Sequence, residues 1–414
     1  MTVFDLAIVG SGPTGSAAAL GALRTDPSLR VALLDRADFP RDKSCGDGIA
    51  PHVIDLLARV GVTGIIDGHA PVPRLRLQRG AARVERTMAR PTWVIPRAVF
   101  DHRLRTAAAA AGATVLRHRV CDVHGVGEVH AVGEGRDGRG TGVVTLDGEV
   151  AARTVIGADG VGSVVRRVLG VRQGPMAVAI RGYTPTPSHR AAAQTIVFDT
   201  ARQPAYAWSF DRGDGLSNVG YGQLLGDRID HPSRALLLDR LEALLPGASE
   251  GGPGSWKGAL LPLSSGRWPR QEGRVLLAGD AAGLVNPMTG EGIYYAVATG
   301  LAAGRAAAQA VRAGAPGTAG ARYTRVTRRL LAAHLRHIDL AARLSRVERV
   351  LGAGLRASAR HQRVFDDLVE LGLARGHLTA PMVRGLGREL LRPSHHPDPL
   401  RSMVDVTEGE RCGS

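Results

Sequence analysis

Three glycines near the start of the chain are spaced as in a phosphate-binding loop. Gly10, Gly12 and Gly15 follow a short apolar run, and Asp35 comes about 20 residues after the last of them. In such a loop the first glycine permits a tight turn, the second lets the backbone approach a pyrophosphate, and the third allows close helix packing. The phosphates would lie at the N-terminus of a helix beginning near Thr14, and Asp35 would accept hydrogen bonds from ribose hydroxyls. This loop predicts a bound dinucleotide and leaves NAD, NADP and FAD open.

Two later motifs narrow that choice. Asp159 and Asp280 each follow a short apolar run and a glycine, in the sequences GADG and GDAA. An Asp in this place can cap a helix, and in a flavin domain it can also accept from a ribityl hydroxyl. Asp280 is the stronger candidate for the flavin, because Pro287 and the turn Gly290-Glu291-Gly292 follow it and lead into a helix at Ile293. The dipole of that helix would stabilise negative charge on the reduced flavin ring, so we expect FAD.

A separate site for NAD(P)H is not indicated. The sequence contains no second combination of strand, glycine loop and helix. We therefore expect the electrons to come from NAD(P)H that binds only transiently or from a separate redox protein, and the sequence favours neither. The many basic residues of the chain would attract both donors.

The elements that must position these motifs alternate between strand and helix in the first part of the chain. We expect buried strands at residues 4–9, 31–34, 115–118, 155–157 and 275–278, helices at 16–23, 53–60 and 100–111, and hairpins within 123–150. Residues 176–183, 195–199, 206–210 and 218–224 favour antiparallel strands, followed by a helix at 236–245. After residue 292 the pattern is helical. The predicted fold class is α/β: a discontinuous, Rossmann-like FAD-binding domain of the glutathione-reductase type, an inserted antiparallel β-sheet domain and a helical C-terminal region.

The same pattern sets the expected domain boundaries. The FAD-binding domain is predicted to comprise residues 1–74, 92–173 and 255–315, and the substrate-binding sheet residues 75–91 and 174–254. The helical region is predicted at 316–392. Residues 393–414 are polar and contain proline, which predicts a poorly ordered tail.

Composition excludes several classes of protein. The chain has 414 residues, of which 44% are hydrophobic, but no uncharged apolar run of about 18 residues that could cross a membrane. Its cysteines, Cys45, Cys121 and Cys412, are too few and too scattered for a disulfide framework or a zinc site. With no signal peptide recognised, we expect a cytoplasmic protein without a metal. The net charge of +15 accompanies no nucleic-acid-binding motif, so no nucleic-acid partner is expected.

The basic charge is concentrated near the C-terminus. Residues 322–363 contain eleven Arg but only Asp339 and Glu348 as acidic residues, and apolar residues recur there at helical spacing. A basic amphipathic helix of this kind can lie on an anionic membrane surface. The alternative is the solvated face of an ordinary packed helix. The sequence carries no signal of an oligomeric state.

Several stretches resemble one family of flavoproteins. The segment from Phe39 to Gly48, the residues Pro96 to Asp101, the strand Tyr206 to Phe210 and the motifs at 279–282 and 286–295 are similar to the geranylgeranyl reductase family. They resemble especially its menaquinone-reductase-like branch, which is related to flavin monooxygenases of the aromatic hydroxylase type. The resemblance covers roughly residues 1 to 310 and not the Arg-rich tail. The residues expected to hold FAD are Gly10, Gly12, Pro13, Thr14, Gly15, Asp35, Arg36, Cys45, Gly46, Arg97, Val120, Asp159, Gly279, Asp280, Pro287, Gly290, Gly292 and Ile293.

The resemblance also implies roles for these residues. Cys45 and Gly46 would approach the isoalloxazine ring, Arg97 would contact the flavin, and Val120 would meet the adenine. The substrate cavity would be lined by Tyr206, Trp208 and Phe210. Members of the family reduce C=C bonds of polyprenyl chains with a hydride from N5 of reduced flavin and a proton. Cys45 would position or donate that proton, and the alternative is a small thiol that only packs.

One departure from the family pattern concerns the substrate strand. Asp211 and Arg212 follow Phe210 where the family has proline, so either the cavity mouth is altered or Asp211 is a turn residue. The leading prediction is an FAD-dependent reductase acting on an isoprenoid or other hydrophobic lipid. The alternatives are an FAD-dependent monooxygenase, either a hydroxylase or an epoxidase, and a non-catalytic flavoprotein or lipid-binding module. The cofactor fold is common to these classes and does not separate them.

Overall fold

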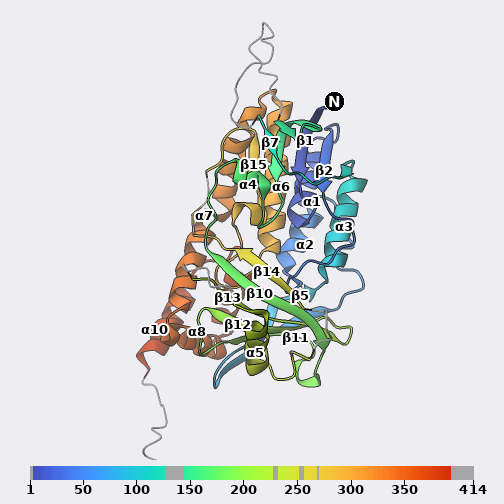
Figure 1. Cartoon of the computed structure of the whole chain (residues 1–414). Coiled ribbons are helices and arrows are strands. Elements are labelled where there is room, and N and C mark those ends of the chain that lie inside the picture. Colours follow the sequence, from blue (N-terminus) through green and yellow to red (C-terminus); the bar gives the residue numbers. More distant parts are fainter. Residues whose placement is uncertain (1–2, 126–143, 227–231, 251–255, 268–269, 393–414) are drawn as a thin grey trace, which may run out of the picture.

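The computed structural model describes residues 3–125, 144–226, 232–250, 256–267 and 270–392. Two β-sheets form the two halves of the molecule, and a long helix, α7 (Ala319–Ser345), runs down one side (Figure 1). Most of the hairpin region predicted at 123–150 and the predicted tail at 393–414 lie outside the described residues. The α/β fold predicted from the sequence is confirmed.

The first sheet carries the glycine-rich loop. Five of its strands are parallel, in the order β6-β2-β1-β9-β15, and antiparallel β8 and β7 extend it beside the first half of β9. Their bounds are β1 Val3–Val9, β2 Val31–Asp35, β6 Thr114–Arg117, β7 Val123–His124, β8 Val144–Leu146, β9 Val150–Gly157 and β15 Val275–Leu277. Because the carboxyl ends of parallel strands meet at one edge, the residues Gly10, Asp35, Asp159 and Asp280 come to the same edge of this sheet.

Helices cover the first sheet with small side chains. The pair α1 (Pro13–Thr25) and α6 (Ile293–Arg312) packs closely, and α2 (Pro51–Ala58) and α3 (Arg97–Ala110) add to the same core. The short helix α4 (Val164–Val168) belongs to a second core together with β9 and β15. Both α1 and α6 are rich in Ala and Gly, which lets their backbones approach each other.

The second sheet crosses below the first (Figure 1). Its order is β14-β10-β13-β12-β11-β4-β5-β3, antiparallel except for the β11–β4 pair. The bounds are β3 Gly48–Ile49, β4 Pro71–Arg79, β5 Ala82–Val94, β10 Met176–Pro185, β11 Ala193–Phe198, β12 Ala205–Asp211, β13 Leu216–Leu224 and β14 Lys257–Pro262. Alternate residues of a strand face opposite sides. In β12, Ala205 and Ala207 therefore pack toward α5 (Arg234–Leu244), while Tyr206, Trp208 and Phe210 face the other side.

The C-terminal helices close that other side. Helices α8 (Glu348–Arg360) and α9 (Gln362–Leu373) pack on β4 and β5 through Leu355 and Phe365, and α10 (Ala380–Leu391) packs on α8. The strand β14 pairs with β10, although the expected boundaries assign residues 255–315 to the FAD-binding domain. The domain boundaries themselves stay a prediction.

The Arg-rich region differs from the single amphipathic helix that its spacing indicates. It is divided between α7, α8 and the start of α9, with a break at Arg346 and Val347. Its apolar residues do not share one face: Leu331, Leu335 and Ile338 are buried, whereas others are exposed. The exposed ones are Leu330, Leu340, Leu344 and Val347. None of the helices that the structure describes is long and apolar enough to cross a membrane.

Candidate active site

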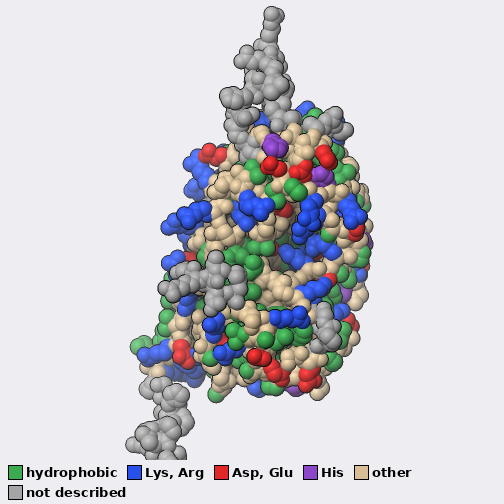
Figure 2. All heavy atoms as spheres, viewed as in Figure 1, with side chains coloured by type: hydrophobic (Ala, Val, Ile, Leu, Met, Phe, Trp, Pro, Cys, Tyr) green, Lys and Arg blue, Asp and Glu red, His purple; other side chains and the backbone are tan. Residues whose placement is uncertain are grey.

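One cavity of about 1490 Å³ lies between the two sheets and the C-terminal helices. Figure 2 shows Lys and Arg side chains gathered around a hollow in this face of the molecule. The cavity brings together nearly all the residues predicted from the sequence: the glycine loop, Asp35, Cys45, Arg97, Val120, Asp159, Asp280, the turn at 287–293 and the three aromatic residues of β12. Gly15 and Gly279 are the two predicted site residues that do not line it.

Both of these glycines lie directly behind the lining. A Cβ atom at Gly15 would stand 1.8 Å from the carbonyl oxygen of Gly10. Gly279 has a φ of +57°, and a Cβ there would stand 2.2 Å from Oγ1 of Thr14. Gly15 therefore lets two backbone segments touch, which fits its expected close packing, and Gly279 lets the chain after β15 approach the side chain of Thr14.

The nucleotide end of the cavity is arranged around Asp35. Its carboxylate accepts hydrogen bonds from the backbone N–H of Ser11 (2.8 Å) and from the Ser11 hydroxyl (3.1 Å). Gly10, with a φ of +98°, makes the turn out of β1. Asp35 thus holds the glycine loop in place and also lines the cavity, while its contact with a ribose stays a prediction.

Asp159 and Asp280 have different surroundings. Asp159 accepts from the Val164 N–H (2.7 Å) and from the Ser163 hydroxyl, so it caps α4. Asp280 lies in the helical turn Gly279–Ala282 and forms an ion pair with Lys43 at 3.3 Å. The carboxylate of Asp280 therefore has capacity for a further donor, such as a ribityl hydroxyl.

The chemistry of the cavity edge fits FAD. Helix α1 begins at Pro13 without a side-chain cap, so its first N–H groups are available to a phosphate. Next to this end lies the guanidinium of Arg41, 3.3 Å from where a Gly12 Cβ would stand. Helix α6 begins at Ile293, and the Glu291 carboxylate accepts from the Tyr294 N–H in its first turn (2.8 Å). The positive end of α1 suits a pyrophosphate, and the start of α6 lies at the part of the cavity where the flavin ring is expected.

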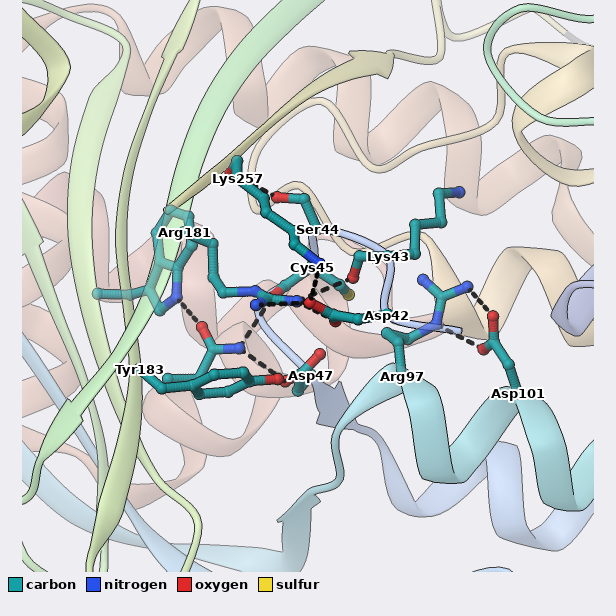
Figure 3. Close-up of polar contacts among 12 residues, drawn as sticks. Asp42, Lys43, Ser44, Cys45, Asp47, Arg97, Asp101, Arg181, Tyr183 and Lys257 are labelled. Atoms are coloured by element: carbon teal, nitrogen blue, oxygen red, sulfur yellow. Dashed lines mark hydrogen bonds and ion pairs between the residues drawn. The ribbon is translucent and has the colours of Figure 1, made fainter. Parts of the chain in front are cut away.

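The segment before Cys45 is held by residues that the sequence did not single out. Arg181 on β10 is 1% exposed and donates to Asp42 (2.6 Å), to the Lys43 carbonyl (3.0 Å) and to the Cys45 carbonyl (3.2 Å) (Figure 3). Lys257 on β14 adds a second ion pair to Asp42 at 2.7 Å. Both lysines of the chain, Lys43 and Lys257, line the cavity. No local motif marks these contacts, because they join segments more than 130 residues apart.

Cys45 lies between opposing electrostatic influences. Burial raises the pKa of its thiol, and the neighbouring guanidinium of Arg97 opposes that rise. Arg97 is itself buried and pairs with Asp101 through two bonds of 2.6 and 2.8 Å. The four-residue spacing of this pair on α3 is visible in the sequence, but its burial is not.

The aromatic strand forms the opposite wall. Trp208 donates from Nε1 to Asn218 on β13 (2.9 Å), and the Tyr206 hydroxyl donates to the Thr289 carbonyl. A Cβ at Gly46 would stand 3.4 Å from the Phe210 ring, so a side chain there would narrow the space. Asp211 accepts from the backbone N–H of Ala192 (2.6 Å) and Gly213 (2.9 Å). These bonds favour the second of the two interpretations of Asp211, which stands where the family has proline: it is a turn residue and does not alter the cavity mouth.

Two further features of the cavity escaped sequence reasoning. Glu291 at the start of α6 lines it, and burial raises the pKa of this carboxyl to about 7. Apolar side chains of the C-terminal helices also line the cavity, and we call this part of it the apolar arm. Residues lining this arm include Leu344, Leu351, Leu355, Leu368, Met382 and Leu386. The sequence placed no motif in these helices, since apolar residues at helical spacing do not distinguish a core from a channel.

Comparison with known proteins identifies the family. Residues 3–198 match the FAD binding domain family. Over 332 residues the chain is 35% identical to a menaquinone reductase of Mycolicibacterium smegmatis, covering 75% of this chain and 76% of that protein. It is 32% identical to a geranylgeranyl diphosphate reductase of Rhodobacter capsulatus, covering 76% and 77%. The chain belongs to the geranylgeranyl reductase family.

Solved structures agree with this family at the level of the fold. A geranylgeranyl bacteriochlorophyll reductase-like protein of Thermoplasma acidophilum superposes with a TM-score of 0.70 at 19% identity, covering 98% of this chain and all of that one. A probable FAD-dependent monooxygenase of Pseudomonas aeruginosa superposes with a TM-score of 0.60 at 20% identity, covering 88% and 100%. Membership of the geranylgeranyl reductase family confirms the predicted FAD-dependent oxidoreductase. The roles of the individual site residues stay predictions.

Proposed function

We propose that this protein reduces C=C bonds of an isoprenoid chain carried by a hydrophobic substrate. The observation that carries the proposal is the apolar arm, which continues from the chamber at Cys45 and Trp208 to the C-terminal helices. A long apolar ligand gains free energy by leaving water for such a channel. The relatives add support, since they are called menaquinone reductase, geranylgeranyl diphosphate reductase and digeranylgeranylglycerophospholipid reductase.

The reduction combines a cofactor with residues of the chain. When bound, FAD supplies a hydride from N5 of its reduced ring. The predicted set of cofactor residues binds the dinucleotide at the parallel sheet, and Tyr206, Trp208 and Phe210 orient the chain of the substrate. The C-terminal helices exclude water from it. Cys45 stands beside Arg97 at the junction of the two regions, where its thiol either positions or donates the proton.

The electron donor is proposed to be NAD(P)H that binds transiently or a separate redox protein. Basic residues line the cavity on the side of the nucleotide, among them Arg36, Arg41, Lys43, Arg119 and Lys257. A nicotinamide nucleotide carries negative phosphates and an acidic redox protein carries negative side chains, so both are attracted to this rim. We further propose peripheral contact with a membrane through α7 and α8, where an isoprenoid lipid would enter.

Anaerobic turnover tests the proposed function. The yellow protein is reduced with dithionite without oxygen and mixed with geranylgeranyl diphosphate, menaquinone or a digeranylgeranylglycerophospholipid. We expect flavin reoxidation at one of these substrates, with a product that stays heavier by two hydrogens in mass spectrometry after any quinol has been reoxidised in air. Turnover that requires oxygen and adds an oxygen atom would overturn the proposal in favour of a monooxygenase. Tight FAD with no turnover on any substrate would indicate a non-catalytic flavoprotein.

A Cys45→Ser variant in the same assay defines the role of the thiol. A variant that reduces the substrate at the wild-type rate would remove Cys45 from the chemistry. A rate that falls while the affinity for the substrate is retained would assign it a chemical role.

A further inference from the structure

Asp47 is a buried carboxylate beside Cys45 that the proposed function does not use. Its side chain is fully buried, yet the residue lines the cavity. The backbone of Asp47 has a φ of +60°, a conformation that non-glycine residues rarely adopt. This backbone is fixed by the bond from the Ile95 N–H to the Asp47 carbonyl and by the clamp of Arg181 on the preceding residues.

The two carboxylate oxygens of Asp47 are used differently. Oδ2 accepts from the Tyr183 hydroxyl and from the side-chain amide of Asn218 (2.8 Å). Asn218 also donates to the Cys45 carbonyl (2.8 Å) and accepts from Trp208. Oδ1 has no hydrogen-bond partner among the described residues. Figure 3 shows one oxygen directed at Tyr183 and the other turned away from it.

The charges that face Asp47 come from three elements. Arg181 and Tyr183 lie on β10, Arg97 lies on α3, and Cys45 lies on the same loop. The two guanidinium groups favour the carboxylate, but burial outweighs them and raises the pKa of Asp47 to about 6. A buried oxygen without a partner is costly, and a proton on Oδ1 would relieve that cost.

We propose that Asp47 supplies the proton that completes the reduction and that Tyr183 links it to solvent. This inference rests on the proposed function. The C=C bond opens as one carbon takes the hydride, and the other carbon takes the proton from Oδ1 as the O–H bond of Asp47 breaks. The electron pair of that O–H bond stays on the carboxylate. Cys45 is left with the positioning role.

Tyr183 is placed to restore the proton. It is half-buried, so one part of it is accessible from outside while its hydroxyl donates to Asp47. The guanidinium groups of Arg181 and Arg212 lie over its ring, 4.5 and 4.7 Å from the ring centre, and fix its orientation. Burial and the charge of Asp47 raise the pKa of Tyr183, so it passes a proton on only as it takes one from water. That proton arrives on Oδ2, and rotation of the carboxyl group about its Cβ–Cγ bond brings it to the position of Oδ1 before the next turnover.

The test compares variants of the reduced holoenzyme with the substrate that the wild type turns over. Asp47→Asn keeps the shape and the acceptor atom but has no acidic proton, so we expect reoxidation to slow by about 10²- to 10⁴-fold. Asp47→Glu should recover part of the rate, and Tyr183→Phe should slow it less than Asp47→Asn does. The wild-type rate should fall as pH rises through about 6, and this dependence should vanish in Asp47→Asn.

Asp199→Asn is the matched control, because Asp199 is also a buried carboxylate that accepts from a tyrosine hydroxyl, that of Tyr221 (2.9 Å), but it does not line the cavity. It should leave the rate and its pH dependence unchanged. An Asp47→Asn variant that binds FAD and reduces the substrate at the wild-type rate overturns the inference.

Infrared titration keeps the two proposals distinguishable. If the wild type turns over no substrate, the proposed function fails, and the protonation of Asp47 is still measured from its carboxyl band. We expect a band that is present below pH 6, disappears above it and is missing from Asp47→Asn. A band that is absent from the wild type across this range shows a carboxylate that stores no proton.

Discussion

At the scale of the residue, two carboxyl groups in the cavity keep their protons up to a higher pH than carboxyl groups in water do. Glu291 accepts from the Tyr294 N–H (2.8 Å), which favours its charged form, but burial has the larger effect and its pKa rises to about 7. Asp47 follows the same rule, with its pKa raised to about 6. Both groups therefore bind protons in the folded chain at pH values where the unfolded chain has lost them.

This difference predicts a stability that declines toward neutral pH. Between about pH 4.5 and 7 the folded state binds the proton of Glu291 and the unfolded state does not, so the free energy of unfolding falls as pH rises through this window. Glu291→Gln should remove up to about 3 kcal/mol of that decline in the flavin-free protein, measured by urea unfolding at several pH values.

The control for this prediction is Glu242→Gln, because hydrogen bonds from Ser249 and Gly247 lower the pKa of Glu242. The contribution of Glu242 to stability is lost as pH falls. Glu242→Gln should therefore change the slope of unfolding free energy against pH in the direction opposite to Glu291→Gln. A Glu291→Gln variant with the wild-type pH profile would contradict the assignment.

At the scale of the element, the glycine loop depends on the contact between α1 and α6. A Cβ at Gly300 would stand 2.3 Å from the Thr14 carbonyl oxygen, and one at Gly304 would stand 1.9 Å from that of Ala18. The four-residue spacing places both glycines on one face of α6. This close approach brings the start of α1, with its free N–H groups, beside the Gly279–Ala282 turn that carries Asp280.

Gly304→Ala should therefore push the two helices apart. We expect a loss of about 1–3 kcal/mol in unfolding free energy and weaker FAD binding, measured by denaturant unfolding and by flavin fluorescence. The comparison is Gly387→Ala on α10, where a Cβ would meet nothing within 4 Å. That change should stabilise the helix by up to about 1 kcal/mol. Equal effects of the two variants would show that helix contact is not the cause.

At the scale of the whole molecule, the exposed apolar residues of the C-terminal helices lie close to the apolar arm. Leu344 is 36% exposed and Val383 is 59% exposed, and both also line the cavity. Leu340 and Val347 are exposed near the same end of α7, among arginines such as Arg346. Apolar side chains within a basic surface suit the headgroup region of an anionic membrane.

Liposome flotation checks this surface. We expect the protein to float with vesicles that contain anionic lipid at low salt and to lose binding when Leu344 and Val347 are both replaced by Ser. The matched control is Leu216→Ser. Leu216 has the same exposed fraction as Leu344, 36%, but lies on β13 outside the apolar arm. No flotation of the wild type at low salt would mean that the arginines only form the solvated face of a packed helix.

The sequence by itself determined the cofactor fold and much of the site around it. Gly10, Asp35 and Asp280 follow strands of a parallel sheet, and local spacing is enough to predict that such residues meet at one edge. The strand with Trp208 and the segment with Cys45 were likewise recognisable as motifs. Only the tertiary structure decided how these segments are held, because Arg181, Asn218 and Lys257 reach Cys45 and Asp42 across more than 130 residues. The apolar arm and the raised pKa values of Asp47 and Glu291 also come from burial, which depends on what packs around a residue and not on its neighbours in the chain.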